Sequence, residues 1–110
     1  MEHSTEQRGG ATVVRLTGDV DLQHSPEARK VLLAAVKAGK PVVVDLSGVS
    51  YIDSSGIASL VEGLQEARKS GGSLALAAVS EGAMRVLRLA RLDKVFVIAD
   101  DVPAATAKLG

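Results

Sequence analysis

Strand-like and helix-like segments alternate along almost the whole chain, and this alternation limits the possible folds more than any other feature. The strand-like runs, rich in Val, Leu, Ile and Ala, are residues 11–17, 41–49, 73–79 and 94–98. The stretches with apolar residues at helical spacing follow them, at residues 25–39, 55–70, 80–91 and 100–110. This order predicts one α/β domain with a mostly parallel sheet of four to five strands and about four helices.

Local signals place the ends of these elements. Ser25, followed by Pro26 and Glu27, is expected to cap the first helix. Ser80 is expected to cap the third helix, and Asp100 or Asp101 is expected to lie near the positive end of the fourth. Residues 1–10 are expected to form either a flexible N-terminus or an edge strand, with the folded domain at residues 11–110.

Bulk composition excludes several classes of protein. The 110 residues have a formal net charge of zero, which gives no electrostatic footprint for nucleic acid. There are no cysteines, so disulfides and Cys-ligated zinc are excluded, and we expect no metal. No apolar run approaches the roughly 18 residues of a membrane span, and the polar residues 1–10 do not resemble a signal peptide. We therefore expect a soluble, cytoplasmic protein without membrane insertion.

The sequence also lacks the usual signals of an enzyme. The only histidines are His3 and His24, and neither is placed by sequence beside a serine that it could activate. Phosphate-binding loops of the GxxxxGK[ST] and GxGxxG kinds are absent. These observations predict a protein that is not an enzyme and uses no cofactor.

The tetrapeptide Asp53-Ser54-Ser55-Gly56 lies between a strand and a helix and has two interpretations. In the structural one, Asp53 or Ser54 caps the helix and Gly56 allows close packing. In the functional one, an exposed serine at the positive end of the helix accepts a phosphate, which adds a charge of about −1.5 to −2. That charge would disturb a docked partner more than the fold.

Three segments resemble the STAS-domain family, and most closely its bacterial anti-sigma factor antagonists. They are RLTGDVD at residues 15–21, VVVDLSGVSYIDSSGIASL at residues 42–60, and the stretch from Gly71 to Ala105. Within them, DLSGVSYIDSSG is the most specific part. The resemblance covers nearly the whole chain and implies a STAS-type domain.

The resemblance also implies a mechanism and a set of residues. Ser54 matches the phosphoacceptor, and the implied partner is an anti-sigma factor with serine kinase activity, whose mark a PP2C-type phosphatase removes. Unphosphorylated antagonist binds this partner and frees a sigma factor. The expected partner-binding residues are Asp19, Asp21, Asp53, Ser55, Gly56, Ala58, Ser59 and Glu62. The last three are expected on the exposed face of the second helix, which is alternatively a plain solvated face.

Other functions remain open at this point. Arg85, Arg88 and Arg91 would meet an acidic partner or only solvent. STAS domains also serve as subunits of lipid-transport ABC systems, bound to the ATPase, and such subunits do not depend on a phosphoserine. A third possibility, a small-ligand binder or a hydrolase that uses Ser54, is disfavoured by the missing base.

Overall fold

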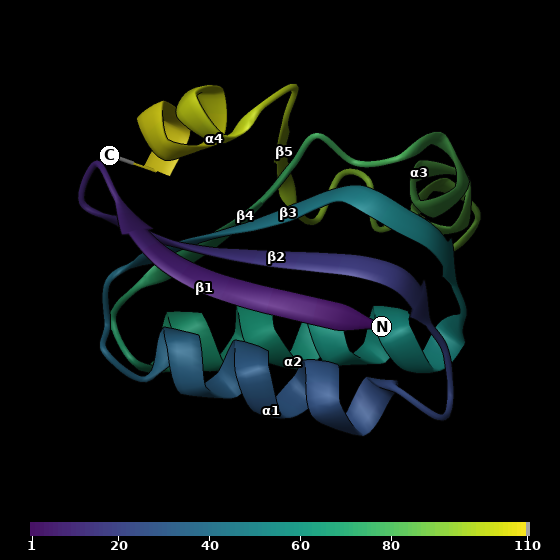
Figure 1. The fold of residues 1–110 in the computed structure, drawn as a ribbon. Coiled ribbons are helices and arrows are strands. Elements are labelled where there is room, and N and C mark those ends of the chain that lie inside the picture. Colours follow the sequence, from purple (N-terminus) through teal and green to yellow (C-terminus); the bar gives the residue numbers. More distant parts are fainter. Residues whose placement is uncertain (110) are drawn as a thin grey trace.

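The computed structural model describes residues 1–109 and confirms the α/β class, with one five-stranded sheet in the order β1-β2-β3-β4-β5 (Figure 1). β1 runs antiparallel to β2, and every other neighbouring pair is parallel. The elements are β1 Glu2–Arg8, β2 Ala11–Val20, α1 Ser25–Val36, β3 Pro41–Ile52, α2 Ser54–Lys69, β4 Ser73–Ala77, α3 Glu81–Leu89, β5 Val97–Ala99 and α4 Val102–Leu109.

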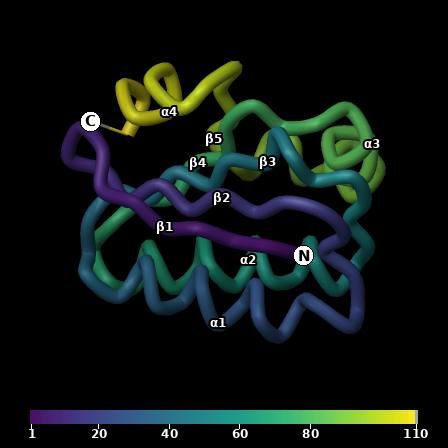
Figure 2. Tube along the Cα trace, in the orientation of Figure 1, coloured from purple at the N-terminus to yellow at the C-terminus, as the bar shows by residue number. Residues whose placement is uncertain are grey.

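The helices cover the two faces of the sheet unequally. α1 and α2 run side by side beneath one face, whereas α4 lies on the other face and α3 lies beside the end of β3 (Figure 2). β3 shows the alternation that produces both layers. Val42 and Val44 belong to the large core that includes residues of α1 and α2, and Val43 belongs to the small core that includes residues of α4. The apolar run of β3 is therefore buried on both faces, as expected for a central parallel strand.

β3 is longer than the sequence predicts because it changes neighbours halfway. It pairs with both β2 and β4 up to Asp45, and beyond that point it pairs with β2 alone. The buried Asp45 carboxylate accepts hydrogen bonds from the Ser47 amide at 2.9 Å and from Arg15 Nε at 3.2 Å. Burial alone would raise the pKa of Asp45, but these bonds outweigh it and hold the pKa below its usual value.

The extended halves of β2 and β3 reach beyond β4 and end together. Their pairing shifts register twice, between Arg15 and Thr17 and between Gly18 and Asp19. Such irregularities bend a strand pair and redirect its ends. Val20 and Ile52 are the last pair. The turns that follow these two residues are thereby brought to the same edge of the sheet.

Two predicted details of the elements are wrong. Ser25 does not cap α1: the N-cap is His24, and Ser25 lies inside the helix because the turn from Asp21 already bonds its amide, at 2.8 Å from the Asp21 carbonyl. The last strand begins at Val97 rather than Lys94, since residues 93–95 form a turn closed by the Val95 amide on the Leu92 carbonyl.

The Ser80 cap agrees with the sequence prediction, and Asp101, expected near the positive end of the last helix, also caps it. The Ser80 hydroxyl accepts the Ala83 amide at 3.3 Å, and the Asp101 carboxylate accepts the Ala104 amide at 2.8 Å. Residues 1–10 were expected to be either a flexible segment or an edge strand. They contain the edge strand β1.

Candidate functional site

The start of α2 is organised by one carboxylate. Asp53 is the N-cap, and its Oδ1 accepts the amides of Ser55 at 2.9 Å and Gly56 at 3.1 Å, together with the Ser55 hydroxyl. Its Oδ2 accepts the amide of Leu22 at 3.0 Å. The residue therefore both caps α2 and ties it to the turn between β2 and α1. Of the two capping candidates in the sequence, Asp53 rather than Ser54 has this role.

Asp53 is a charged group at neutral pH. The hydrogen bond from the Ser55 hydroxyl lowers its pKa, and although burial acts in the opposite direction, the amides of Gly56, Ser55 and Leu22 lower it further. A negative charge at the N-terminus of a helix is favourable because the amide dipoles point toward it. The turn thus holds a fixed anion beside Ser54.

Gly56 is required by packing. A Cβ atom at this position would lie 2.4 Å from the Val20 carbonyl oxygen and 2.7 Å from the Ile52 side chain. Gly56 is buried, and its lack of a side chain allows α2 to approach the end of β2. This residue therefore supports the turn from below instead of presenting a side chain to a partner.

The two serines of the turn differ in environment. Ser54, the first residue of α2, is exposed, and within residues 1–109 its hydroxyl has no hydrogen-bond partner. The Ser55 hydroxyl donates to Asp53 and the residue is half-buried. Of these two serines, Ser54 is the one with an accessible hydroxyl whose modification breaks no existing hydrogen bond.

The two aspartates before α1 have different surroundings. Asp19 is exposed at the end of β2. Asp21 is half-buried, and its carboxylate bonds the His24 ring, with 2.7 Å between Oδ1 and Nδ1. Burial alone would raise the pKa of Asp21, but the hydrogen bonds from His24 outweigh it and lower the pKa. His24 is thus directed to Asp21, where it holds the turn together.

The predicted exposed face of α2 is partly wrong. Ala58 is exposed, but Ser59 is only 5% exposed. The Ser59 hydroxyl donates to the Ser25 carbonyl at 3.2 Å and so lies in the seam between α1 and α2. Glu62 forms an ion pair with Arg29 of α1. Ser59 is buried because the helical period places it on the same side as the buried Gly63, four residues on, which faces Leu32 of α1.

Two exposed apolar residues adjoin the turn, Leu22 through a hydrogen bond and Tyr51 through the chain, and the sequence interpretation did not include them. Leu22 is 76% exposed and its amide bonds Asp53, while Tyr51, two residues before Asp53, is 53% exposed. Large exposed apolar groups near a polar site are typical of protein contact surfaces. The sequence signal for Leu22 was a lone leucine among the polar residues of a turn.

The part of the chain that the structure describes contains no cluster of metal ligands. No group of three or more His, Cys, Asp or Glu side chains within residues 1–109 is arranged to hold a metal ion. In the same part of the chain, no helix has both the length and the apolar character needed to cross a bilayer. The site consists of an exposed hydroxyl, a fixed carboxylate and adjacent apolar side chains.

The fold and the site define a small α/β domain with a mostly parallel sheet and a serine turn at the end of its central strand. A family model described as "Mlab, STAS domain" matches residues 3–99. The chain therefore belongs to the STAS domain family.

Individual relatives carry a common name. The chain is 31% identical over 85 residues to the anti-sigma-B factor antagonist of Bacillus subtilis, which covers 77% of this chain and 78% of the relative. An anti-sigma factor antagonist from Mycobacterium paratuberculosis superposes with a TM-score of 0.88 at 25% identity, over 98% of this chain and 92% of that one.

A third relative has been solved in two states. The Bacillus protein SpoIIAA in its phosphorylated form matches with a TM-score of 0.73 at 19% identity, over 99% of this chain and 100% of that one. In its unphosphorylated form SpoIIAA, described as an anti-sigma factor antagonist, matches with a TM-score of 0.79 at 18% identity, over 97% of this chain and 95% of that one. At these identities the likeness shows the shared fold.

Proposed function

We propose that this chain is an anti-sigma factor antagonist whose binding is controlled at Ser54. In its unphosphorylated form it binds an anti-sigma factor that has serine kinase activity, in the cytoplasm, and so releases a sigma factor. The protein is a binding module and a kinase substrate rather than an enzyme. The observation that carries the proposal is the exposed Ser54 hydroxyl beside the fixed Asp53 carboxylate. Family membership and the antagonist from Bacillus subtilis support it.

The chemistry of the switch is phosphoryl transfer. The kinase transfers the γ-phosphoryl group of ATP to the Ser54 oxygen, ADP leaves, and the hydroxyl proton goes to solvent or to a base of the kinase. A PP2C-type phosphatase restores the hydroxyl by hydrolysis. In the unmodified state the Ser54 hydroxyl makes no hydrogen bond within residues 1–109, so the kinase has no internal bond to break.

The electrostatics explain why phosphorylation would change binding rather than folding. The phosphate adds a charge of about −1.5 to −2 at the positive end of α2, which tolerates an anion. The same phosphate stands next to the ionised Asp53, so the two anions together make a strongly negative spot. A partner that buries Leu22 and Tyr51 in the unmodified state would have to desolvate this spot, which is costly.

The proposed contact surface follows from exposure. Asp19, Ser54, Ala58 and the two apolar groups Leu22 and Tyr51 are exposed and reach a partner directly. A second group of residues shapes this surface from within, namely Asp21, Asp53, Ser55, Gly56, Ser59 and Glu62.

The experiment compares three baits in lysate of the native host, with mass spectrometry of the captured proteins. Ser54→Ala should capture a small ATP-binding kinase, Ser54→Asp should capture much less of it, and Ser55→Ala should behave like the unmodified chain. Incubation of the captured kinase with ATP and wild-type protein should place the phosphate on Ser54. Equal capture of the kinase by the alanine and aspartate forms would contradict the switch. Equal capture of an ABC ATPase would instead favour a lipid-transport subunit.

A further inference from the structure

The strand β1 leaves one edge of the sheet unpaired. It is the outermost strand and pairs only with β2 among the strands of residues 1–109 (Figure 1). All seven of its residues, Glu2 to Arg8, are exposed. An open edge presents a row of unused amide and carbonyl groups to any other strand.

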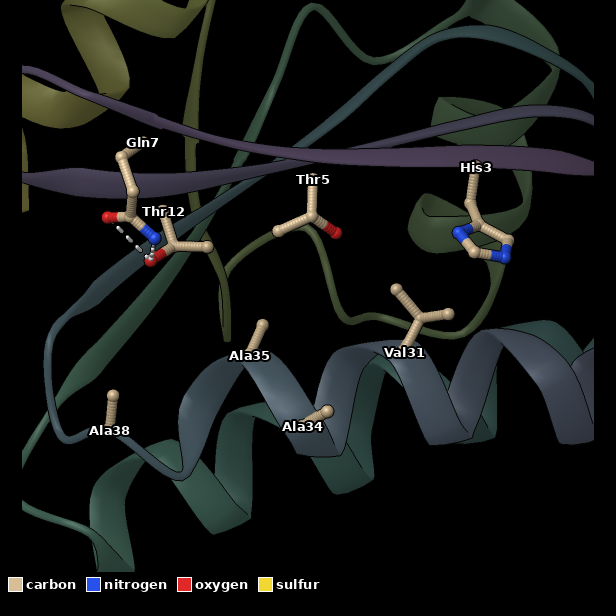
Figure 3. Close-up of a pocket in the computed structure, with 8 residues that line it drawn as sticks. All are labelled: His3, Thr5, Gln7, Thr12, Val31, Ala34, Ala35 and Ala38. Atoms are coloured by element: carbon tan, nitrogen blue, oxygen red, sulfur yellow. Dashed lines mark hydrogen bonds between the residues drawn. The ribbon is translucent and has the colours of Figure 1, made fainter.

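The side chains of β1 divide between two faces. His3, Thr5 and Gln7 point toward α1 (Figure 3). Because side chains alternate along a strand, Glu2, Ser4, Glu6 and Arg8 lie on the opposite face. All of the charged carboxylates and the guanidinium of β1 are therefore on one face.

α1 contacts the face of β1 that looks toward it at His3, whose Nε2 lies 3.2 Å from Glu27 Oε1, but it does not fill the space along the rest of the strand. A hollow of about 390 Å³ lies between them and is bounded on the helix side by Val31, Ala34, Ala35 and Ala38 (Figure 3). The alanines are too short to fill the gap. α1 therefore covers this face of β1 only in part, and β1 is the outermost strand of the sheet in the described part of the chain.

The charges of β1 are complementary to a second copy of the same strand. When two copies pair antiparallel with Thr5 opposite Thr5, Glu2 lies opposite Arg8 of the second copy, and Arg8 lies opposite its Glu2. His3 then faces Gln7, and Ser4 faces Glu6. Opposite charges directly across a strand pair are stabilising. The twofold symmetry of the pair doubles each of these contacts.

Neighbouring registers are unfavourable. With the symmetry axis at Ser4, Glu2 faces Glu6 of the second copy, and with the axis at Glu6, that glutamate faces itself. Like charges directly opposite are destabilising. A register shifted by one residue would place the axis between two residues. Each side chain would then be opposite one that points to the other face of the sheet, which a twofold axis perpendicular to the sheet forbids. Among the registers that pair at least five residues of each β1 strand, only the axis at Thr5 combines charge attraction with no carboxylate pair.

We propose that this chain forms a twofold symmetric homodimer through β1, in which two five-stranded sheets join into one. Thr5 lies on the axis, and the pairs between Glu2 and Arg8 set the register. The two hollows beneath β1 then meet under the joined strands. A contact formed by one polar strand from each copy is small, so the dimer is weak and forms only at high protein concentration.

Cysteine crosslinking tests the register directly, because the chain contains no cysteine of its own. Residues opposite each other on antiparallel strands have Cα atoms about 4.5–5.5 Å apart, which suits a disulfide. Thr5→Cys should therefore form a covalent dimer under mild oxidation. His3→Cys should not form one. His3 lies on the same face as Thr5, but in this register it is opposite Gln7 and four residues away from His3 of the second copy. Equal crosslinking of both variants, or of neither, would overturn the proposal.

Charge exchange tests the same interface without a covalent bond. Sedimentation equilibrium should show a concentration-dependent dimer for the wild type. Arg8→Glu should raise its dissociation constant about tenfold or more, because two attractive pairs become repulsive. The double variant Glu2→Arg with Arg8→Glu should restore dimerisation. A wild type that stays monomeric, or a dimer indifferent to both changes, would refute the interface. Circular dichroism checks that each variant keeps the fold.

Discussion

α2 and α3 begin at the same edge of the sheet, each after a parallel strand, yet their first turns are built differently. The N-terminus of α3 is capped by one Ser80 hydroxyl, which accepts a single amide at 3.3 Å. The N-terminus of α2 is capped by a carboxylate that accepts three amides and a hydroxyl and reaches a second loop. The α3 arrangement suffices to start a helix. The additional contacts at α2 therefore hold the serine turn in place.

The glycines in the first turns of α2 and α3 also differ in how closely they are packed. Gly56 in the first turn of α2 is pressed against the Val20 carbonyl, whereas Gly82 in the first turn of α3 is exposed, and a Cβ there would lie 3.5 Å from the Ser50 carbonyl. One glycine is demanded by packing and the other is replaceable. A rigid, closely packed turn keeps Ser54 presented to solvent.

The largest effect is expected from Gly56→Ala. The added methyl would have to displace the backbone at Val20, and overpacking of this kind costs about 3 kcal/mol. Gly82→Ala is the matched control, because the new side chain has ordinary contact distances and alanine favours the helix by up to about 1 kcal/mol. Urea denaturation of both variants measures the difference. Equal stability of the two would show that the packing at Gly56 is not limiting.

The next effect separates a charged cap from a neutral one. Asp53→Asn should destabilise the protein at neutral pH, because the lowered pKa of Asp53 means that folding favours the carboxylate. The sign is that of a depressed acid: its contribution is complete above the unfolded value of 3.8 and is lost as the pH falls through the lower folded value. The stability gap between wild type and Asp53→Asn should therefore shrink below pH 3.8.

Urea denaturation over a pH series gives this gap. The same pH series on Ser80→Ala is the control. A hydroxyl does not titrate in this range, so the difference in stability between wild type and Ser80→Ala should stay constant with pH. A pH-independent gap for Asp53→Asn would mean that the hydrogen bonds do not depend on the charge.

A smaller effect is expected from Ser80→Ala at neutral pH. The lost hydroxyl leaves the Ala83 amide without its side-chain acceptor, and such caps contribute about 1 kcal/mol. The long distance of 3.3 Å places this cap toward the weak end of the range. Thermal unfolding monitored by circular dichroism is sufficient to measure it. A loss as large as that of Asp53→Asn would remove the contrast between the two helix starts.

The sequence predicted the layers of this fold because local patterns determine them. Alternating strand and helix segments gave the α/β class, and the continuous apolar run of β3 gave its burial on both faces. Ser80 was recognisable as a cap, and Asp101 as a residue at the start of a helix, because the amides that they bond are only three residues away. Such features depend on neighbours in the chain.

The features that were missed depend on distant contacts. Ser25 looks like a cap, but the Asp21 carbonyl bonds its amide and starts the helical geometry earlier. Ser59 looks exposed, but α1 packs against it. Lys94 to Phe96 look like a strand, but only Val97 to Ala99 find partners on β4. The bond from Leu22 to Asp53 spans 31 positions, so no local pattern reveals it.

The smallest effect is expected at Ser54 itself. Ser54→Ala removes an exposed hydroxyl without an internal partner, so the free energy of unfolding should change by less than about 0.5 kcal/mol. Ser55→Ala removes the hydroxyl that donates to Asp53 and should cost about 1 kcal/mol. Denaturation curves of the two variants compare neighbouring serines in one turn.

This near-zero value is what makes Ser54 suited to a switch. A site that contributes nothing to stability can gain and lose a phosphate while the turn around it stays folded, because Asp53, Ser55 and Gly56 hold the turn without its help. If Ser54→Ala were as destabilising as Ser55→Ala, the hydroxyl would be part of the cap. Phosphorylation would then unfold the start of α2 instead of changing only the surface that a partner meets.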